Sequence, residues 1–195
     1  MGNIHSVNKA LQLCKARTIV TNNPKEILSS SKVVLPGVGA FSAAMRELER
    51  HGLIPAIKEF IKSGRPLLGI CLGMQLLLQQ SQEAGKRSGL GMLKGRVVRF
   101  SGKNNLKVPH MGWNQLKINA ADCPLLKGIP DNSYVYFCHS YYPLPQDKQI
   151  SAATSDYGVR FGSLLWQDNI YGVQFHPEKS QAIGFKMIQN FVKIC

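Results

Sequence analysis

The sequence predicts an α/β fold, with an open and mostly parallel central sheet, helices on both of its faces, and extra antiparallel strands in the C-terminal half. In the first half of the chain, short apolar or β-branched runs alternate with segments of helical periodicity, as in successive strand–helix units. Residues 67–70 are apolar without interruption, which is typical of a strand buried on both faces of a sheet. Beyond residue 85, strand-like runs separated by Gly, Pro, Asn and Asp replace this alternation and favour antiparallel pairing.

The expected elements can be placed in order along the chain. In the first half we expect helices at residues 6–13 (with Ser6 as N-cap), 24–28, 41–49, 54–63 and 74–80, and strands at 18–21, 32–35 and 67–70. In the second half we expect strands at 96–100, 115–118, 134–137, 151–154, 162–166 and 170–175, and a final helix at 181–194. Neither a linker nor a repeat divides these elements, so we expect the 195 residues to form a single domain.

Composition and charge narrow the classes of function. No apolar run reaches the roughly 18 residues of a membrane span. Five scattered cysteines without a C-x-x-C pair argue against a disulfide framework or a metal site and indicate the cytoplasm, and we expect no cofactor. A net charge of +13 is typical of nucleic-acid-binding proteins, but no nucleic-acid-binding motif accompanies it. Residues 85–121 are basic and free of acidic residues, and we expect them to steer the chain onto an acidic partner.

Cys71 lies where the buried strand meets the following helix, with Gly69 and Gly73 two residues away on either side. This G-x-C-x-G spacing is that of a nucleophile elbow with Cys in place of Ser. Glycine at the flanking positions avoids the clashes that side chains would make in so tight a turn. The N-terminal end of the helix beside the thiol favours the thiolate. A buried core cysteine is the alternative interpretation of Cys71 taken alone.

His176 ends the last apolar run, and Glu178 follows two residues later. Open α/β sheets form their sites at the carboxyl ends of strands. A cysteine nucleophile needs a base that takes its proton and later protonates the leaving group, and a carboxylate that orients this base. We therefore predict a catalytic triad of Cys71, His176 and Glu178. His110 and His139 remain rival bases, since His139 also follows a strand-like run.

The segment P-G-V-G at residues 36–39 also follows an expected strand. Its two glycines free the backbone to turn N–H groups toward a ligand, as an oxyanion hole requires, and the amide of Leu72 is a second natural donor. Taken alone, the four residues indicate only a turn.

The residues described so far resemble a known family. G-I-C-L-G-M-Q at 69–75 and F-H-P-E-K-S at 175–180 are similar to the motifs of class I, triad-type glutamine amidotransferases. The resemblance narrows with L-P-G-V-G-A-F at 35–41, V-P-H-M-G-W-N at 108–114 and H-S-Y-Y at 139–142, which together resemble the glutaminase subunits of imidazole glycerol phosphate synthase, from histidine biosynthesis. It covers essentially the whole chain.

The resemblance implies a function and a set of site residues. Glutamine would be hydrolysed to glutamate and ammonia through a glutamyl thioester on Cys71, with the oxyanion held by the backbone of Leu72 and of Gly37–Val38. The positions that surround glutamine would be Gly39, Gln75, His139, Ser140 and Tyr141. A (β/α)₈-barrel cyclase would form a heterodimer with the chain, receive the ammonia, and make imidazole glycerol phosphate and AICAR. The residues at this subunit contact would be Pro109, Met111, Trp113 and Lys179.

The chain departs from the family pattern at its start. The family normally opens with an apolar strand that ends near D-Y-G, whereas this chain begins at Met1-Gly2-Asn3. We therefore expect a single amidotransferase domain that lacks the first strand and leaves a sheet edge open. Three alternatives remain: a paralogous subunit that supplies ammonia for surface-sugar amidination, a thiol hydrolase acting on peptides or γ-glutamyl compounds, and a basic, non-catalytic binding module.

Overall fold

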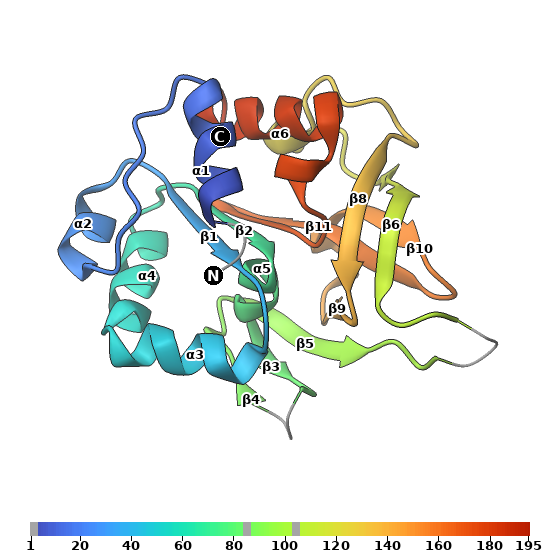
Figure 1. Cartoon of the computed structure of the whole chain (residues 1–195), viewed down its shortest axis with the longest axis horizontal. Helices are drawn as coiled ribbons and strands as arrows, with labels where there is room; N and C mark the ends of the chain where they lie inside the picture. The colour runs from blue at the N-terminus through green and yellow to red at the C-terminus, as the bar shows by residue number, and fades with distance from the viewer. Residues whose placement is uncertain (1–3, 84–86, 103–105) are drawn as a thin grey trace.

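A six-stranded sheet forms the centre of the protein in a computed structural model that describes residues 4–83, 87–102 and 106–195 (Figure 1). Its strands, in spatial order, are β1 (Val33–Gly37), β2 (Leu67–Cys71), β12 (Ile170–Val173), β11 (Arg160–Gln167), β10 (Ser151–Asp156) and β7 (Lys117–Ile118). The pairings β1–β2 and β2–β12 are parallel, and the other three are antiparallel. The α/β class is confirmed, although fewer of the pairings are parallel than expected.

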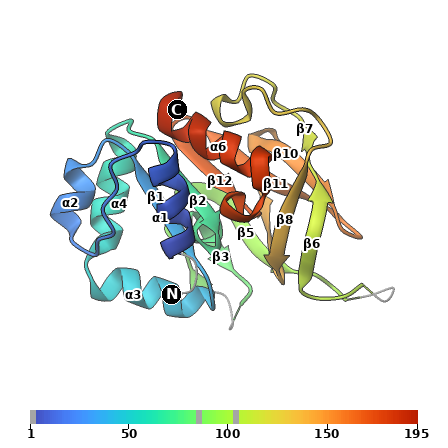
Figure 2. The ribbon, with the colours of Figure 1, turned by 45° about the horizontal axis from the view of Figure 1, so that its top comes forward.

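Helices cover both faces of this sheet. On one face lie α1 (Ile4–Leu13) and α6 (Gln181–Lys193), which contact each other and share a core with Leu68 and Ile70 of β2 (Figure 2). On the other face, Leu67 of β2 shares a second core with α2 (Pro24–Ser29), α3 (Phe41–Arg50) and α4 (Leu53–Lys62). All five residues of β2 are buried, so the uninterrupted apolar run is a strand buried on both faces, as predicted. None of the described helices is long and apolar enough to cross a bilayer.

Two smaller sheets complete the fold. One has the order β4 (Arg87–Ser88), β3 (Leu78–Ser81), β5 (Leu93–Arg99) and β9 (Tyr141–Pro145). The other is the antiparallel pair β6 (His110–Gln115) and β8 (Tyr134–His139). Short 3₁₀ turns lie at Pro124–Leu126, Lys148–Ile150 and Pro177–Lys179. Extra antiparallel strands in the C-terminal half are therefore confirmed.

Four sequence predictions of secondary structure are wrong. The helix expected at 74–80 is the short α5 (Leu72–Leu76), because the backbone at 76–79 bonds to residues 89–93 and residues 78–81 form β3. Residues 18–21 form no strand: they pair with no described strand, and Ile19 and Val20 stay exposed. Helix α1 begins at Ile4, so Ser6 lies within the helix and is not its N-cap. The expected strand at 115–118 falls across the end of β6 and β7.

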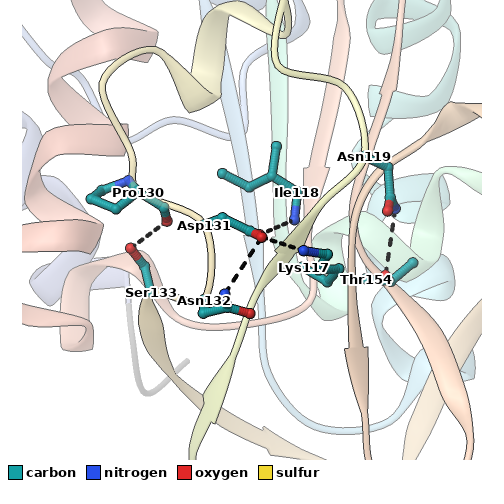
Figure 3. A network of polar contacts seen from close by, with 8 residues as sticks. All are labelled: Lys117, Ile118, Asn119, Pro130, Asp131, Asn132, Ser133 and Thr154. Carbon is teal, nitrogen blue, oxygen red and sulfur yellow. Dashed lines mark hydrogen bonds and ion pairs between the residues drawn. The ribbon is translucent and has the colours of Figure 1, made fainter.

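The short edge strand β7 is tied to the loop that leads into β8 (Figure 3). The Asp131 carboxylate forms an ion pair with Lys117 and accepts a hydrogen bond of 2.8 Å from the backbone N–H of Ile118. The Ser133 hydroxyl donates to the Pro130 carbonyl at 2.7 Å, which closes the same loop. The hydrogen bond from Lys117 and that from Ile118 hold the pKa of Asp131 below its usual range.

The contacts of Asp131 with Lys117 and Ile118 predict that Asp131→Asn changes the stability of the protein in a pH-dependent way. Since the folded-state pKa of Asp131 is depressed, its contribution to stability is present at neutral pH and is lost as the pH falls through that pKa. We expect a lower Tm than wild type at pH 7, with a difference that shrinks on acidification, as followed by circular dichroism. Glu49→Gln, on the exposed side of α3, is the matched charge control and should show no such trend. A Tm difference for Asp131→Asn that is independent of pH would contradict this assignment.

Candidate active site

The chain turns sharply at Cys71, between β2 and α5, in the geometry of a nucleophile elbow. Cys71 has φ 54° and ψ −110°, a conformation that L residues rarely adopt. A Cβ added to Gly69 would lie 2.7 Å from Cα of Met74, and one added to Gly73 would lie 1.7 Å from the Leu35 carbonyl oxygen. Only glycine fits at either flank, so the predicted elbow is present for the steric reason expected.

His176 and Glu178 meet Cys71 from the end of β12. His176 Nδ1 lies 2.9 Å from Glu178 Oε1, and both side chains are almost completely buried. Burial acts to lower the pKa of His176, but hydrogen bonds with Cys71 and Glu178, together with their charges, outweigh it and raise this pKa to about 9. The geometry therefore favours an imidazolium held between Cys71 and the carboxylate.

The loop that carries His176 is fixed by Ser180. The Ser180 hydroxyl donates to the His176 carbonyl at 2.7 Å and accepts from the Tyr136 N–H at 3.0 Å. The His176 N–H in turn donates to the Tyr136 carbonyl at 2.9 Å. Strand β8 thus helps to place the imidazole, a role that the sequence analysis did not assign to Ser180 or Tyr136.

The two rival histidines do not face Cys71 as bases. They bond to each other, with His110 Nδ1 3.0 Å from His139 Nε2, and His139 Nδ1 lies 2.8 Å from the Tyr141 carbonyl. Burial lowers the pKa of His110 to about 4 and that of His139 to about 3, so both rings are neutral at pH 7. His176 is left as the base with both an orienting carboxylate and a contact to the thiol.

Gln174, which the sequence analysis missed, lies against the nucleophile. Its side chain is completely buried, and its Nε2 lies 3.8 Å from Cys71 Sγ. The Cys138 carbonyl is 4.0 Å from the same sulfur. A polar residue inside the otherwise apolar run at 170–175 was the signal available in the sequence.

The residues predicted for the oxyanion hole lie beside the elbow. Gly37 pairs in register with Cys71, and a Cβ added to it would lie 3.0 Å from Gly73 N and 3.1 Å from Leu72 Cβ. Val38 and Gly39 follow on an exposed turn, where Gly39 has φ 90°. Gly37 is therefore a close neighbour of the first residues of α5, and the role of Leu72, Gly37 and Val38 as oxyanion donors stays a prediction.

Four of the five residues predicted to surround the substrate are brought together near Cys71. Gln75 Nε2 donates to the Tyr141 carbonyl at 2.9 Å and to Gln174 Oε1 at 3.0 Å. His139 shares that carbonyl, and Ser140 is half-buried between β8 and β9. The Gln75 amide nitrogen is thus engaged inside the protein and supports the site. Gly39 is separate from this group, on the turn after β1.

The residues predicted to contact a partner lie on β6, just before it, or on the turn after β12. Pro109 precedes β6, Met111 and Trp113 lie on it, and Lys179 ends the 3₁₀ turn Pro177–Lys179. All four are exposed, and Lys179 Nζ lies 5.7 Å from the centroid of the Tyr136 ring.

Comparisons with known proteins agree with this geometry. The family model described as "Glutamine amidotransferase class-I" matches residues 1–195. The imidazole glycerol phosphate synthase subunit HisH of Geobacter sulfurreducens is 49% identical over 98% of this chain and 93% of its own length. The HisH subunit of Thermosynechococcus vestitus is 45% identical over 100% of this chain and 93% of its own length.

Solved structures share the fold at lower identity. A structure described as a glutamine amidotransferase superposes with a TM-score of 0.75 and 15% identity, covering 98% of this chain and 93% of its own. The glutaminase domain of Trypanosoma brucei CTPS, with bound acivicin, gives a TM-score of 0.66 and 16% identity, covering 98% of this chain and 89% of its own.

The site geometry predicts how the histidines titrate. An NMR titration of the imidazole signals should give His176 a pKa of about 9, whereas His110 and His139 should stay neutral down to about 4 and 3. Because the Glu178 carboxylate helps to raise the pKa of His176, Glu178→Gln should lower it and leave the other two histidines unchanged. If the titration midpoint of His176 is the same in Glu178→Gln as in wild type, the Glu178 carboxylate does not raise the pKa of His176.

Proposed function

Because the chain belongs to the class-I glutamine amidotransferase family, we propose that Cys71, His176 and Glu178 hydrolyse glutamine to glutamate and ammonia. The observation that carries the proposal is the buried contact of His176 with both Glu178 and Cys71 at the end of β12. Relatives at 45–49% identity are HisH subunits of imidazole glycerol phosphate synthase, so the predicted enzyme class, glutamine amidotransferase of histidine biosynthesis, is confirmed.

The first half of the proposed reaction makes a covalent intermediate. The Cys71 thiolate attacks the side-chain carboxamide carbon of glutamine, and the carbonyl oxygen becomes an oxyanion. Backbone N–H groups of Leu72 and of the Gly37–Val38 segment stabilise this charge. His176 gives its proton to the departing nitrogen, the C–N bond breaks, and ammonia leaves a glutamyl thioester on Cys71.

The second half restores the enzyme. His176, now neutral, takes a proton from water, which attacks the thioester carbon. The C–S bond breaks, glutamate leaves, and the proton on His176 again pairs with the Cys71 thiolate. Glu178 holds Nδ1 of the imidazole throughout, so that Nε2 is the nitrogen that exchanges the proton.

The proposed substrate pocket uses the residues gathered around the elbow. Gln75, His139, Ser140 and Tyr141 lie on one side of it, and Gly39 lies on the turn after β1. The chain needs no metal or cofactor for the proposed chemistry. Five free cysteines support the proposal that the protein works in the cytoplasm.

We further propose that the partner subunit is a (β/α)₈-barrel cyclase that uses the ammonia to make imidazole glycerol phosphate and AICAR. The face proposed for it carries Met111 and Trp113, which are 61% and 46% exposed, next to Tyr134 at 56%. Trp113 and Tyr134 line a shallow hollow of about 260 Å³ together with residues 180–183 at the start of α6. Large exposed apolar side chains around a hollow are typical of protein interfaces.

The domain proposal is a single amidotransferase domain with an open sheet edge at β1. Within the described residues, β1 pairs with β2 alone, and all five of its residues are only half-buried. A parallel strand inside an α/β sheet is normally flanked on both sides and buried. Among the described residues, the central sheet is therefore open at the edge beside β1.

Replacement of the nucleophile tests the proposed function. In the complex with the cyclase, Cys71→Ala should lose glutamine-dependent synthesis by at least about a thousandfold, because no thioester can form. Synthesis supplied with ammonium salt should be retained, since ammonia then bypasses the site. Cys14→Ala, which replaces the buried cysteine directly after α1, is the matched control and should keep both activities. Glutamine-dependent synthesis by Cys71→Ala would rule out the mechanism, and peptide hydrolysis by wild type would favour a thiol hydrolase.

Replacement of an exposed aromatic tests the proposed partner face. Trp113→Ala should raise the Kd for the cyclase by about tenfold or more, as for a buried aromatic anchor, in a calorimetric titration. Leu144→Ala removes a side chain of similar exposure (40%) from β9, in a different sheet, and should leave the Kd unchanged. Equal Kd values for wild type and Trp113→Ala would place the partner elsewhere.

A further inference from the structure

A chain of hydrogen bonds runs inward from strand β6. Asn114 Nδ2 lies 3.3 Å from His110 Nε2 and also donates to the Asp156 carbonyl at 2.8 Å. His110 Nδ1 lies 3.0 Å from His139 Nε2, and His139 Nδ1 lies 2.8 Å from the Tyr141 carbonyl. The outer half of the chain therefore ends on a backbone oxygen of β9.

The same carbonyl connects this chain to the nucleophile. Tyr141 O also accepts from Gln75 Nε2 at 2.9 Å, which occupies its second lone pair. Gln75 Nε2 donates in addition to Gln174 Oε1 at 3.0 Å, and Gln174 Nε2 lies 3.8 Å from Cys71 Sγ. Asn114 and Cys71, which belong to different sheets, are thus joined by polar contacts alone.

Only one arrangement of hydrogens gives a donor and an acceptor at each hydrogen bond from Asn114 to the Tyr141 carbonyl. The Tyr141 carbonyl can only accept, so His139 Nδ1 carries the hydrogen and, in the neutral ring, Nε2 accepts. His110 Nδ1 must then donate, and His110 Nε2 accepts from the Asn114 amide. Every donor points toward Tyr141, and reversing any one bond would leave two buried donors or two acceptors facing each other.

The ring of His110 is clamped in this orientation. It lies between Phe137, with ring centroids 4.8 Å apart and planes at 23°, and Tyr157, with centroids 3.9 Å apart and planes at 21°. Stacking on both faces fixes the plane in which Nδ1 points at His139. A shift of the β6 backbone at His110 would therefore move the ring and its hydrogen bond together.

Strand β6 has two functional faces. Met111 and Trp113 alternate outward and are exposed, whereas His110 is 3% exposed and Asn114 half-buried on the inward face. The outward face is the one proposed above to meet the partner subunit.

We propose that His110 and Asn114 are positioning residues for the Cys71 thiol, and that their hydrogen-bond chain transmits a displacement of β6, caused by the partner on its outer face, to the nucleophile. The proposal rests on the proposed function for the identity of the partner. Gln174 is the last member of the chain, and its N–H stabilises negative charge on the sulfur when the chain is intact.

The test measures how fast iodoacetamide alkylates Cys71 at pH 7.5, by mass spectrometry of the Cys71 peptide. Wild type and variants are compared, each with and without the cyclase. In the isolated chain, His110→Leu should slow alkylation about fivefold, because the chain that holds Gln174 against the sulfur loses one neutral hydrogen bond and the effect of such a loss is of that order. Addition of the cyclase should change the rate in wild type and leave His110→Leu unaffected. His110→Asn, whose amide can take the place of Nδ1 as donor, should restore most of both effects.

The control removes packing without removing a hydrogen bond. Leu125→Ala removes a buried side chain of the same apolar core that takes no part in the hydrogen-bond chain, and it should lower the Tm while alkylation stays near the wild-type rate. A folded His110→Leu variant with the wild-type rate and response, or an equal slowing in Leu125→Ala, would overturn the proposal. If His110→Leu does not fold, Asn114→Leu supplies the same comparison from the outer end of the chain.

The two proposals fail in different ways. If wild type shows no glutaminase activity with the cyclase, the proposed function fails, and the alkylation rates of the isolated variants still decide the positioning role. If wild type is active and His110→Leu matches it in both alkylation and kcat, only the positioning role fails.

Discussion

The contact between Gly73 and strand β1 is the constraint on which the site depends. The space for a Cβ at Gly73 is filled by the Leu35 carbonyl, so the first turn of α5 presses directly on β1. Gly172 allows the same approach on the other side, where an added Cβ would lie 2.3 Å from Cγ of Met74. Helix α5 therefore packs over β2 between β1 and β12, and Cys71 is forced into a conformation with positive φ that costs roughly 1–3 kcal/mol.

The pairing of β12 with β2 brings the two halves of the chain to one site. Val173 lies in register with Ile70, so the residues that follow β12 emerge beside the elbow. Gln174 then faces the thiol, and His176 reaches it with Glu178 behind. Strands β10, β11 and β12 pair antiparallel in sequence order, and β12 then pairs with β2. The second half of the chain thereby brings the base His176 next to Cys71.

The chemistry could be predicted from the sequence because it lies in short, contiguous motifs. The two glycines around Cys71 and the two-residue spacing of His176 and Glu178 are local requirements of the elbow and of the imidazole–carboxylate contact. The end of α5 could not be predicted, because the backbone at 76–79 bonds to residues 89–93, and periodicity within 74–80 carries no sign of that pairing. Likewise, His110 and His139 are 29 residues apart in the sequence and meet only because β6 and β8 pair with these two residues in register.

If Cys71 forms a covalent bond to the substrate carbon, the mass of the protein after acid quenching during turnover of glutamine should reveal it. We expect an added glutamyl group on the peptide that contains Cys71, lost again when the quench is delayed until glutamine is exhausted. Turnover of glutamine with no adduct at Cys71, or with the adduct on another cysteine, would contradict it.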